Sequence, residues 1–362
     1  MTISHHGQLH PWTKPAGMFA RGCAIALIVF HNYFHALPPK IGENEFGYQP
    51  IYTKYLEYFL EHPGTVVQLS LAFWGWIAVG VFVVLSAYGM TVKSDKAAIQ
   101  SQIPFLLSRF KKLYPVFFMA IIIHFFLIAI HREEAISSWL IGYIAKLSLL
   151  TNFIPGYELK IVGPWWFFSL IFQMYIVVPS LIRLFHRYGN VFLLALTGFY
   201  AFMMLVVDPY IAIKIRMTVI GWLPEISLGI YWASASGKIF KIAYLIPVVA
   251  IFIMGNTSPV LWIAQSVTGT FILMYLLALL FKSLSPSNAF VRWMIFLGTI
   301  SLPIFAINAP IRSVFLDTDS GIGQPLFSIF LSVVFLLVVT VTGYLCHVLD
   351  QKIQRVMTRR SN

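Results

Sequence analysis

Charged residues are scarce in this chain. Only 10% of its 362 residues are Asp, Glu, Lys or Arg, whereas 59% are hydrophobic. A soluble domain carries about 25% charged residues, so this composition excludes an ordinary soluble enzyme or binding module. The mean hydropathy of +0.81 agrees with a chain that lies mainly in lipid. We therefore predict an all-α, polytopic membrane protein.

Cysteine is also rare. Cys23 and Cys346 are the two cysteines, and both lie in or beside apolar segments, which indicates packing residues rather than a disulfide. No cluster of Cys and His has the spacing of metal ligands, so we expect no metal site. The opening residues 1–15 lack the cationic start and short apolar core of a cleavable signal peptide. We expect them to form a short cytoplasmic tail.

Acidic residues are outnumbered by basic ones, 13 against 25, which gives a net charge of +12. In a soluble protein this balance would suggest nucleic acid as a partner. Here most basic residues fall in alternate loops, as the cytoplasmic loops of membrane proteins do. We therefore expect membrane lipids and no nucleic acid as partners, both termini in the cytoplasm, and a basic cytoplasmic tail over 349–362.

Long apolar segments dominate the chain, and a helix needs about 20 residues to cross a membrane. We predict about ten transmembrane helices, at 17–37, 66–92, 113–130, 165–185, 190–207, 217–235, 242–256, 258–281, 292–311 and 324–347. The loops are too short for a second domain, so residues 1–362 form one membrane-embedded unit. Of the two long external loops, 38–65 and 131–164, the second contains an apolar stretch, 136–150, that is expected to lie at the membrane interface.

The first apolar segment carries Arg21, His31 and His35 inside a membrane-length run. A central Arg costs roughly 2.5 to 3.5 kcal/mol on insertion scales, and such residues mark functional sites. Helical rise separates Arg21 from His31 by about 15 Å, which places Arg21 near the cytoplasmic face and His31 inside the bilayer. Asn32 lies in line with Arg21. The alternative is a snorkelling Arg and a His that bonds a neighbouring helix.

The second segment contains Gly80-Val-Phe-Val-Val-Leu-Ser-Ala-Tyr-Gly89. Its small residues permit close approach of another helix. The alternative is that Ser86 and Tyr88 line a narrow space for a thin ligand beside the histidine.

A basic loop, 93–112, leads into the third segment. Arg109 and Lys112 lie three residues apart and so share a helical face, where they could hold phosphates. Ordinary positive charge at the cytoplasmic end of a span is the alternative.

Polar and aromatic residues also mark two later segments. Trp165 and Trp166 stand at the head of a span, as an aromatic belt predicts, while Gln173 in the middle needs a partner. Glu225 is the one carboxylate predicted at membrane depth. It is a candidate partner for His31 or for a substrate hydroxyl, and an interhelical hydrogen bond is the equal alternative.

Taken together, these segments resemble the acyltransferase-3 family of integral membrane O-acyltransferases, which modify bacterial polysaccharides. The matching segments are Arg21–His31, Phe82–Tyr88, Arg109–Pro115, Trp165–Pro179 and Leu297–Asn308. The chain departs from the family pattern at several positions: Ala87 replaces a glycine, Lys112 an arginine, Gln173 a glutamate and Asn308 a histidine. Nine residues rather than ten separate Arg21 from His31, so a strict alignment would put Asn32 in the histidine position.

The resemblance implies a multi-pass protein of the bacterial plasma membrane that takes acetyl groups from cytoplasmic acetyl-CoA. Arg109 and Lys112 would hold the phosphates of CoA, and its arm would pass Ser86 and Tyr88. His31 would be the general base, or form a transient acyl-histidine, with Arg21 and Glu225 as further catalytic residues. The acceptor, a polysaccharide or its lipid-linked precursor, would contact Trp165, Trp166, Gln173, Asn32 and His35. The rival interpretations are a transporter or flippase of a lipid-linked glycan, and a sensor without turnover.

Overall fold

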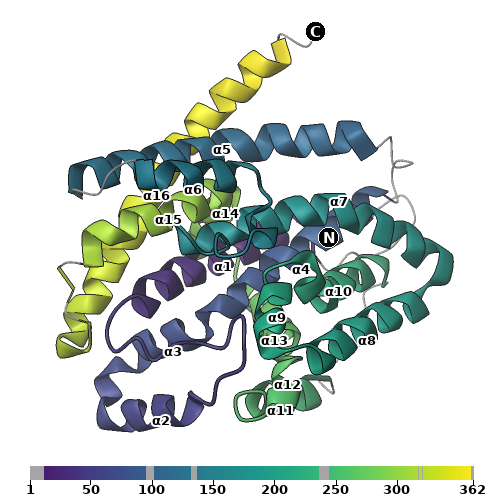
Figure 1. The fold of residues 1–362 in the computed structure, drawn as a ribbon, viewed down its shortest axis with the longest axis horizontal. Coiled ribbons are helices and arrows are strands. Elements are labelled where there is room, and N and C mark those ends of the chain that lie inside the picture. The colour runs from purple at the N-terminus through teal and green to yellow at the C-terminus, as the bar shows by residue number, and fades with distance from the viewer. Residues whose placement is uncertain are drawn as a thin grey trace.

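The computed structural model describes residues 12–94, 102–131, 137–235, 244–316, 318–319 and 321–359. Within these ranges every regular element is a helix (Figure 1). The α-helices are α1 (Lys14–His35), α2 (Tyr52–Glu61), α3 (Val66–Trp74), α4 (Ala78–Ser94), α5 (Gln102–His131), α6 (Ser137–Leu147), α7 (Trp166–Tyr188), α8 (Asn190–Val206), α9 (Pro209–Arg216), α10 (Leu223–Ser234), α11 (Leu245–Met254), α12 (Pro259–Trp262), α13 (Gln265–Ser283), α14 (Ala289–Thr299), α15 (Ser301–Leu316) and α16 (Pro325–Arg359). Short 3-10 turns are η1 (Pro63–Thr65), η2 (Gly75–Ile77), η3 (Thr151–Phe153), η4 (Gly163–Trp165), η5 (Val219–Trp222) and η7 (Gly321–Gly323).

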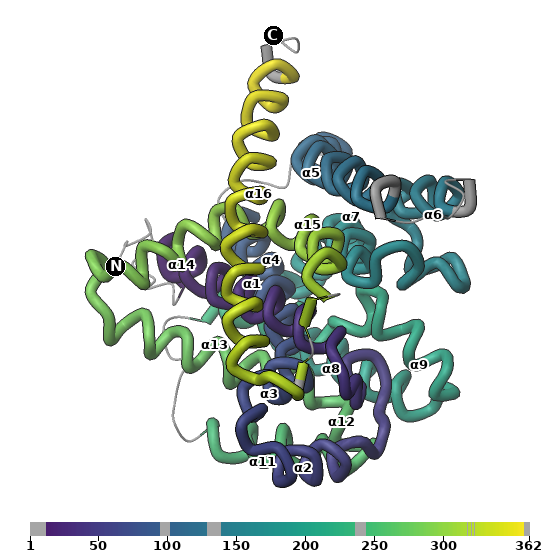
Figure 2. Tube along the Cα trace, turned by 90° about the vertical axis from the view of Figure 1, so that its left-hand side faces the viewer, coloured from purple at the N-terminus to yellow at the C-terminus, as the bar shows by residue number. Residues whose placement is uncertain are grey.

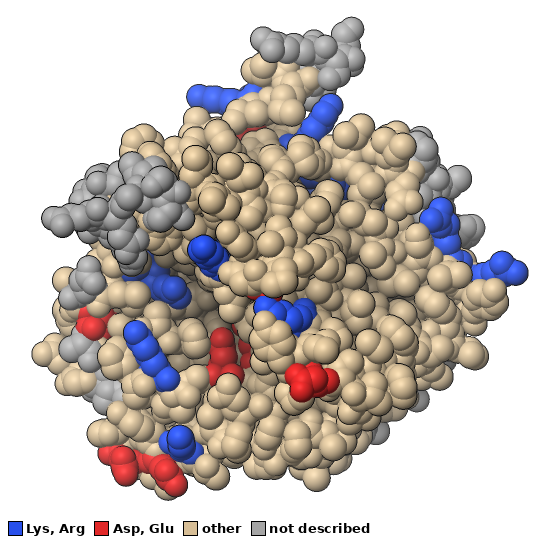
Figure 3. Space-filling view, viewed as in Figure 1, with Lys and Arg blue, Asp and Glu red and all other residues tan. Residues whose placement is uncertain are grey.

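Six helical runs within the described ranges are long and apolar enough to cross a membrane. They are Lys14–His35, Pro63–Ser94, Gln102–Ile128, Gly163–Tyr188, Gln265–Ser283 and Pro325–Met357. Helices α14 and α15 make a seventh if they are taken together, with a bend of 80° at their junction. The face drawn in Figure 3 is largely uncharged, as lipid contact requires. The fold is therefore that of a multi-pass helical membrane protein.

Seven of the ten predicted spans thus have a helical counterpart of spanning length. The other three, at 190–207, 217–235 and 242–256, contain α8, α10 and α11, which have 17, 12 and 10 residues. Such helices are shorter than the about 20 residues that a full crossing needs. The count of ten is therefore not confirmed, and the side of the membrane on which the termini lie stays a prediction.

Helix α1 runs through the middle of the bundle, where it packs against α3, α4, α14 and α15 (Figure 2). Its crossing with α14 is very close, because a Cβ on Gly22 would lie 1.8 Å from the carbonyl oxygen of Met294. A Cβ on Gly298 would in turn lie 2.0 Å from the carbonyl oxygen of Met18. Glycine on both helices lets the two backbones touch, which fixes the position of α1 and of the polar residues on it.

Helix α4 is held in the same way. A Cβ on Gly80 would lie 1.9 Å from the hydroxyl oxygen of Thr270 in α13. On the α10 side, a Cβ on Gly229 would lie 2.5 Å from the carbonyl oxygen of Val84. Gly80 of α4 and Gly229 of α10 therefore serve helix packing, while Ser86 and Gly89 of α4 line a cavity described below.

The predicted tails and the external apolar stretch are partly helical. Residues 14 and 15 already belong to α1, and α16 continues to Arg359, where its last turns project beyond the other helices (Figure 2). The rest of the two tails, 1–11 and 360–362, lies outside the described residues. The stretch 136–150 contains α6, whose 11 residues are too few to cross a membrane.

Candidate active site

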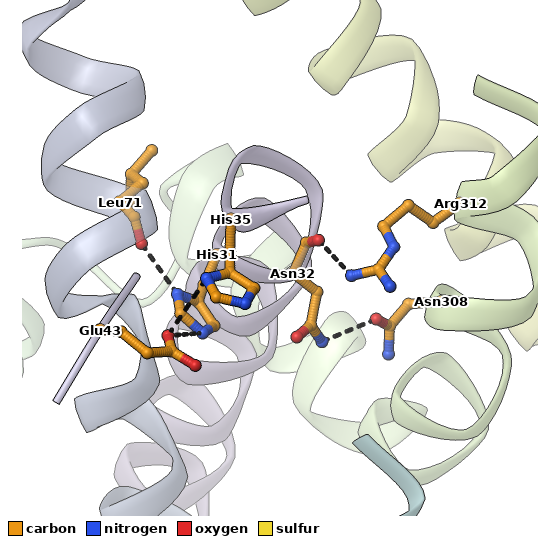
Figure 4. A network of polar contacts seen from close by, with 7 residues as sticks. All are labelled: His31, Asn32, His35, Glu43, Leu71, Asn308 and Arg312. Carbon is orange, nitrogen blue, oxygen red and sulfur yellow. Dashed lines mark hydrogen bonds and ion pairs between the residues drawn. The ribbon is translucent and has the colours of Figure 1, made fainter. Parts of the chain in front are cut away.

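His31 is buried near the end of α1, with 5% of its surface exposed. Its Nδ1 lies 3.0 Å from the backbone oxygen of Leu71 in α3 (Figure 4). A carbonyl oxygen can only accept a hydrogen bond, so Nδ1 carries the proton and donates it. The neutral ring then presents its lone pair at Nε2. The backbone thus fixes both the tautomer and the orientation of the imidazole, as a general base requires.

Gly75, the first residue of η2, lies directly against His31. A Cβ at this position would lie 2.5 Å from the Cβ of His31, well inside van der Waals contact. The missing side chain allows α1 to approach the end of α3 so closely that the Leu71 carbonyl reaches the ring. Neither Gly75 nor Leu71 could be identified from the sequence, because nothing in an apolar segment marks the backbone group that a distant histidine will meet.

The carboxylate partner of His31 is Glu43, from the loop that follows α1. Its Oε2 lies 3.0 Å from His31 Nε2 and 3.5 Å from His35 Nδ1 (Figure 4). Burial alone would raise the pKa of Glu43, but the two imidazoles outweigh this effect, and the pKa lies below its ordinary value. Glu43 is therefore an anion at neutral pH.

A second carboxyl group, on Glu45, points toward the same place. Its residue is only 6% exposed, and its side chain makes no hydrogen bond or ion pair within the described part of the chain. Burial and the nearby Glu43 raise the pKa of Glu45 well above its ordinary value, and Arg216 only partly offsets them. One ligand atom each from His31, Glu43 and Glu45 lies within 4.8 Å of the other two.

Glu45→Gln should raise the melting temperature at pH 7 and change it little at about pH 4. Above the ordinary carboxyl pKa of 4.5, folding must either bind a proton at Glu45 or bury its charge, and glutamine removes that cost. Below this pKa the unfolded chain is protonated as well, so the cost disappears. Thermal unfolding of the purified protein across this pH range measures the effect. A variant less stable than wild type at pH 7 would show that Glu45 is a stabilised anion.

Asn32 and His35, the other polar residues at this end of α1, are placed differently. The Asn32 Nδ2 donates to Asn308 Oδ1 of α15 at 2.9 Å, and Arg312 donates to the Asn32 carbonyl (Figure 4). Asn32 is 8% exposed and Asn308 is fully buried, so this contact ties α1 to α15. The side chain of His35 is 38% exposed and can be reached from outside.

Near the other end of α1, a cavity of about 540 Å³ opens between α1, α4, α5, α7 and α15. Its lining includes five cationic side chains: Lys14, Arg21, Lys93, Arg109 and Lys112. No carboxylate is among the described residues that line it. Ser86 and Tyr88 of α4 also line this cavity, and Tyr88 donates to the Trp12 carbonyl at 3.4 Å. We refer to it as the cationic cavity.

The positive charges in the cationic cavity repel one another. Lys93 lies close enough to Arg21, Arg109 and Lys112 to interact with all three. The Arg109 guanidinium lies 4.9 Å from the ring centre of Phe105 and 5.6 Å from that of Tyr175. Its buried Nε has no hydrogen-bond partner among the described residues. Cations gathered without a counter-charge favour an anionic ligand, and the arginine fork suits a phosphate group.

The structure therefore brings together all four residues that the sequence analysis assigned to the donor, and places Arg21 beside them. Lys93 and Tyr175 were missed. Lys93 could have been found, since it lies seven positions after Ser86 and so shares its helical face.

The cationic cavity does not include His31 in its described lining. Along α4 the lining runs from Lys93 to Phe82, in the direction of η2 and His31. Phe82, Phe167 and Phe305 line this inner end, with ring centres 6.4 Å apart for Phe82 and Phe167 and 5.0 Å apart for Phe167 and Phe305. Aromatic rings therefore form part of the wall of the cationic cavity.

Glu225 is not the partner of His31. It is fully buried in α10 and accepts a hydrogen bond from Ser266 of α13. Helix α10 packs mainly on α4 and α8, whereas His31 faces α3 and the loop that carries Glu43. The structure contains the other predicted contact, an interhelical hydrogen bond, which Ser266 donates to Glu225.

The predicted acceptor residues of α7 and its N-terminal turn lie in the core. The indole of Trp165 is fully buried and donates to the Ala306 carbonyl at 2.8 Å, and Trp166 stacks on Trp222 with ring centres 6.0 Å apart. Gln173 Oε1 accepts from the backbone N–H of Val219 at 3.0 Å. These contacts tie α7 to α15 and η5, and in this arrangement none of the three side chains is open to an acceptor.

Comparison with known proteins agrees with the motifs. No curated protein and no solved structure matches the chain. A family model, that of the acyltransferase-3 domain, matches residues 19–347, which include His31 and most of the cationic cavity. Because this match extends over nearly the whole chain, the protein belongs to the acyltransferase-3 family of membrane acyltransferases.

Proposed function

We propose that this protein is an O-acetyltransferase of the bacterial plasma membrane. It takes the acetyl group of cytoplasmic acetyl-CoA and transfers it to a hydroxyl of an exported polysaccharide or of its lipid-linked precursor. The family supports acyl transfer in a membrane. The donor, the acceptor and the roles of individual residues are inferred from the site.

One observation carries the proposal: α1 joins two chemically different sites. Arg21 lies in the cationic cavity, which suits the phosphates of a nucleotide donor. About 15 Å further along the helix, His31 lies in a buried polar cluster with an oriented imidazole. A donor with phosphates at one end and a thioester on a long thin arm fits this separation. The arm passes the aromatic end of the cavity to reach His31.

The chemistry at His31 is a proton transfer coupled to acyl transfer. Nε2 removes the proton of the acceptor hydroxyl. At the same time the hydroxyl oxygen attacks the carbonyl carbon of the thioester. The carbon–sulfur bond then breaks, and the leaving thiolate takes the proton from Nε2. The products are an acetyl ester and free CoA, and His31 returns to its neutral form.

Glu43 and Leu71 assist this step without touching the acyl group. The Leu71 carbonyl holds the proton of Nδ1, so that Nε2 is the nitrogen that changes its protonation state. The Glu43 carboxylate, 3.0 Å from Nε2, stabilises the positive charge of the imidazolium that forms. His35, which is partly exposed beside Glu43, lies on the path from outside and is the predicted acceptor residue that remains accessible.

Gly75→Ala should lower turnover by about a hundredfold, because the new Cβ would push the His31 ring away from its bonded position. Donor affinity should change little, since Gly75 does not line the cationic cavity. Initial rates at varied donor concentrations separate the two effects. Gly64→Ala is the matched control, because the nearest atom to its added Cβ lies 3.8 Å away. Full turnover by Gly75→Ala would contradict the assigned position of the base.

The function itself is tested by incubating membranes that contain the protein with radiolabelled acetyl-CoA and extracted glycan. We expect labelled glycan and free CoA, both absent from membranes without the protein. A transporter or flippase would move the glycan without labelling it, and a sensor would leave both substrates unchanged. Either of those results would overturn the proposal.

A further inference from the structure

The polar cluster around His31 contains more carboxyl groups than a general base requires. His31, Glu43 and Glu45 each direct one nitrogen or oxygen atom to a common point, and these atoms lie within 4.8 Å of one another. Two of the three residues are at most 6% exposed, and the Glu43 side chain is 14% exposed. Glu43 alone suffices to support the imidazolium, which leaves Glu45 without a role in the reaction.

The contacts of His31 are those of a metal ligand. A histidine that binds a metal through one ring nitrogen donates the other N–H to a carbonyl or carboxylate, which fixes the ring. His31 donates Nδ1–H to the Leu71 carbonyl, and its Nε2 faces Glu43 Oε2 at 3.0 Å. A lone pair and a carboxylate at this distance need a positive species between them. The proton of an imidazolium is one such species, and a bound cation is another.

Glu45 distinguishes these two possibilities. A single proton between His31 and Glu43 leaves the buried Glu45 carboxyl without a hydrogen bond or ion pair in the described part of the chain. A divalent cation would bind all three groups at once. Its two positive charges would balance both carboxylates, so every buried polar atom directed to this point would have a partner.

We propose that His31, Glu43 and Glu45 form a binding site for a divalent transition metal ion, best suited to Zn²⁺. Zn²⁺ binds both imidazole nitrogen and carboxylate oxygen, and three protein ligands leave a fourth position open. Mg²⁺ and Ca²⁺ prefer oxygen ligands alone, so the imidazole disfavours them. Cys23 and Cys346 are not in this cluster, and the site therefore differs from a thiolate site.

The proposed ion has a consequence that rests on the proposed function. Zn²⁺ would occupy the Nε2 lone pair, which is the atom that removes the acceptor proton. Bound zinc should therefore inhibit acyl transfer reversibly. The cationic side chain of Arg216, which lies near Glu45, would limit the affinity.

Titration calorimetry of the purified full-length chain in detergent micelles with Zn²⁺ tests the site. We expect one ion per chain for wild type and for Glu57→Gln, an exposed carboxylate of α2 that serves as the matched control. Glu45→Gln should bind at least about tenfold more weakly, since it loses one ligand. Absence of stoichiometric binding by wild type, or equal affinity of all three proteins, would overturn the proposal.

X-ray absorption spectroscopy of the zinc-loaded wild type gives a test that does not depend on how a variant folds. The expected first shell contains one imidazole nitrogen, oxygen ligands and no sulfur, and any sulfur ligand would refute the site. Acyl transfer is then measured with zinc and with excess chelator. Inhibition that the chelator reverses is expected, and zinc-insensitive transfer would refute the consequence for catalysis. If no preparation transfers acetyl groups, the proposed function fails, while the binding and spectroscopic results still decide the metal site.

Discussion

His31→Ala is expected to lower acetyl transfer by about 10²- to 10⁴-fold, the usual contribution of a positioned general base. The imidazole is buried, oriented by a backbone carbonyl and paired with a carboxylate, as a positioned base requires. The measurement is the O-acetyl content of glycan from cells that produce wild type or variant, compared at equal protein levels in the membrane.

The control for this prediction is His62→Ala. His62 is an exposed histidine that follows α2, and it makes no contact with the Glu43 carboxylate. We expect its acetyl content to equal that of wild type. If His31→Ala accumulates normally in the membrane and the glycan is still fully acetylated, the assignment of the base is wrong.

The second large effect is expected in the cationic cavity. Replacing both Arg109 and Lys112 with alanine should raise the KM for acetyl-CoA by about a hundredfold and leave kcat nearly unchanged. Each hydrogen bond to a charged group contributes about 1.5–3 kcal/mol, and a tenfold change in affinity corresponds to about 1.4 kcal/mol. Phosphates bind equally in the ground state and the transition state, because they lie far from the reacting carbon, so their loss affects KM alone.

Two variants make this prediction specific. Arg183→Ala removes an exposed arginine of α7 that bonds Ser180 and does not line the cavity, and its KM should equal that of wild type. Arg109→Lys keeps the charge but loses the planar fork and its contacts with Phe105 and Tyr175, so an intermediate KM is expected. A double variant whose KM is unchanged would mean that the donor phosphates bind elsewhere.

The residues that sequence reasoning placed correctly in space share a simple property. Arg21, Arg109 and Lys112 lie in the first half of long apolar helices, and Ser86 lies in the middle of α4, so that helical rise and periodicity predict their relative depth and face. In the assembled bundle these residues meet in one cavity. Helical periodicity along single segments was enough to predict that these residues meet, while their role in donor binding stays a prediction.

The polar cluster could not be predicted in the same way. Glu43 and Glu45 come from an irregular loop, and their approach to His31 depends on the path of that loop and on the packing of α1 against Gly75. Glu225 was a candidate partner because it is the one carboxylate that the sequence predicts at membrane depth, with an interhelical hydrogen bond as the equal alternative. Depth alone does not specify which helix face or which neighbour a side chain meets, and Ser266 is the neighbour that it meets.

The aromatic residues and the number of spans also show that a pattern within one segment does not specify what that segment packs against. Trp165 and Trp166 have the sequence signature of an interfacial belt, but the packing of α7 and its N-terminal turn against α15 and η5 buries both rings. Hydropathy also marks α10 and α11 as spans, although turns end these helices after 12 and 10 residues. An apolar segment is equally compatible with lipid and with a protein interior, so hydropathy does not distinguish the two environments.

The central claim is that one helix links a donor site on one membrane face to the site at His31, where the acceptor hydroxyl takes the acetyl group. The most direct measurement uses purified protein in sealed vesicles, with labelled acetyl-CoA supplied on one side only and the glycan acceptor on the other. We predict labelled acceptor when the donor side is the face that bears the cationic cavity, and background label with His31→Ala. Equal labelling by wild type and His31→Ala would contradict the account.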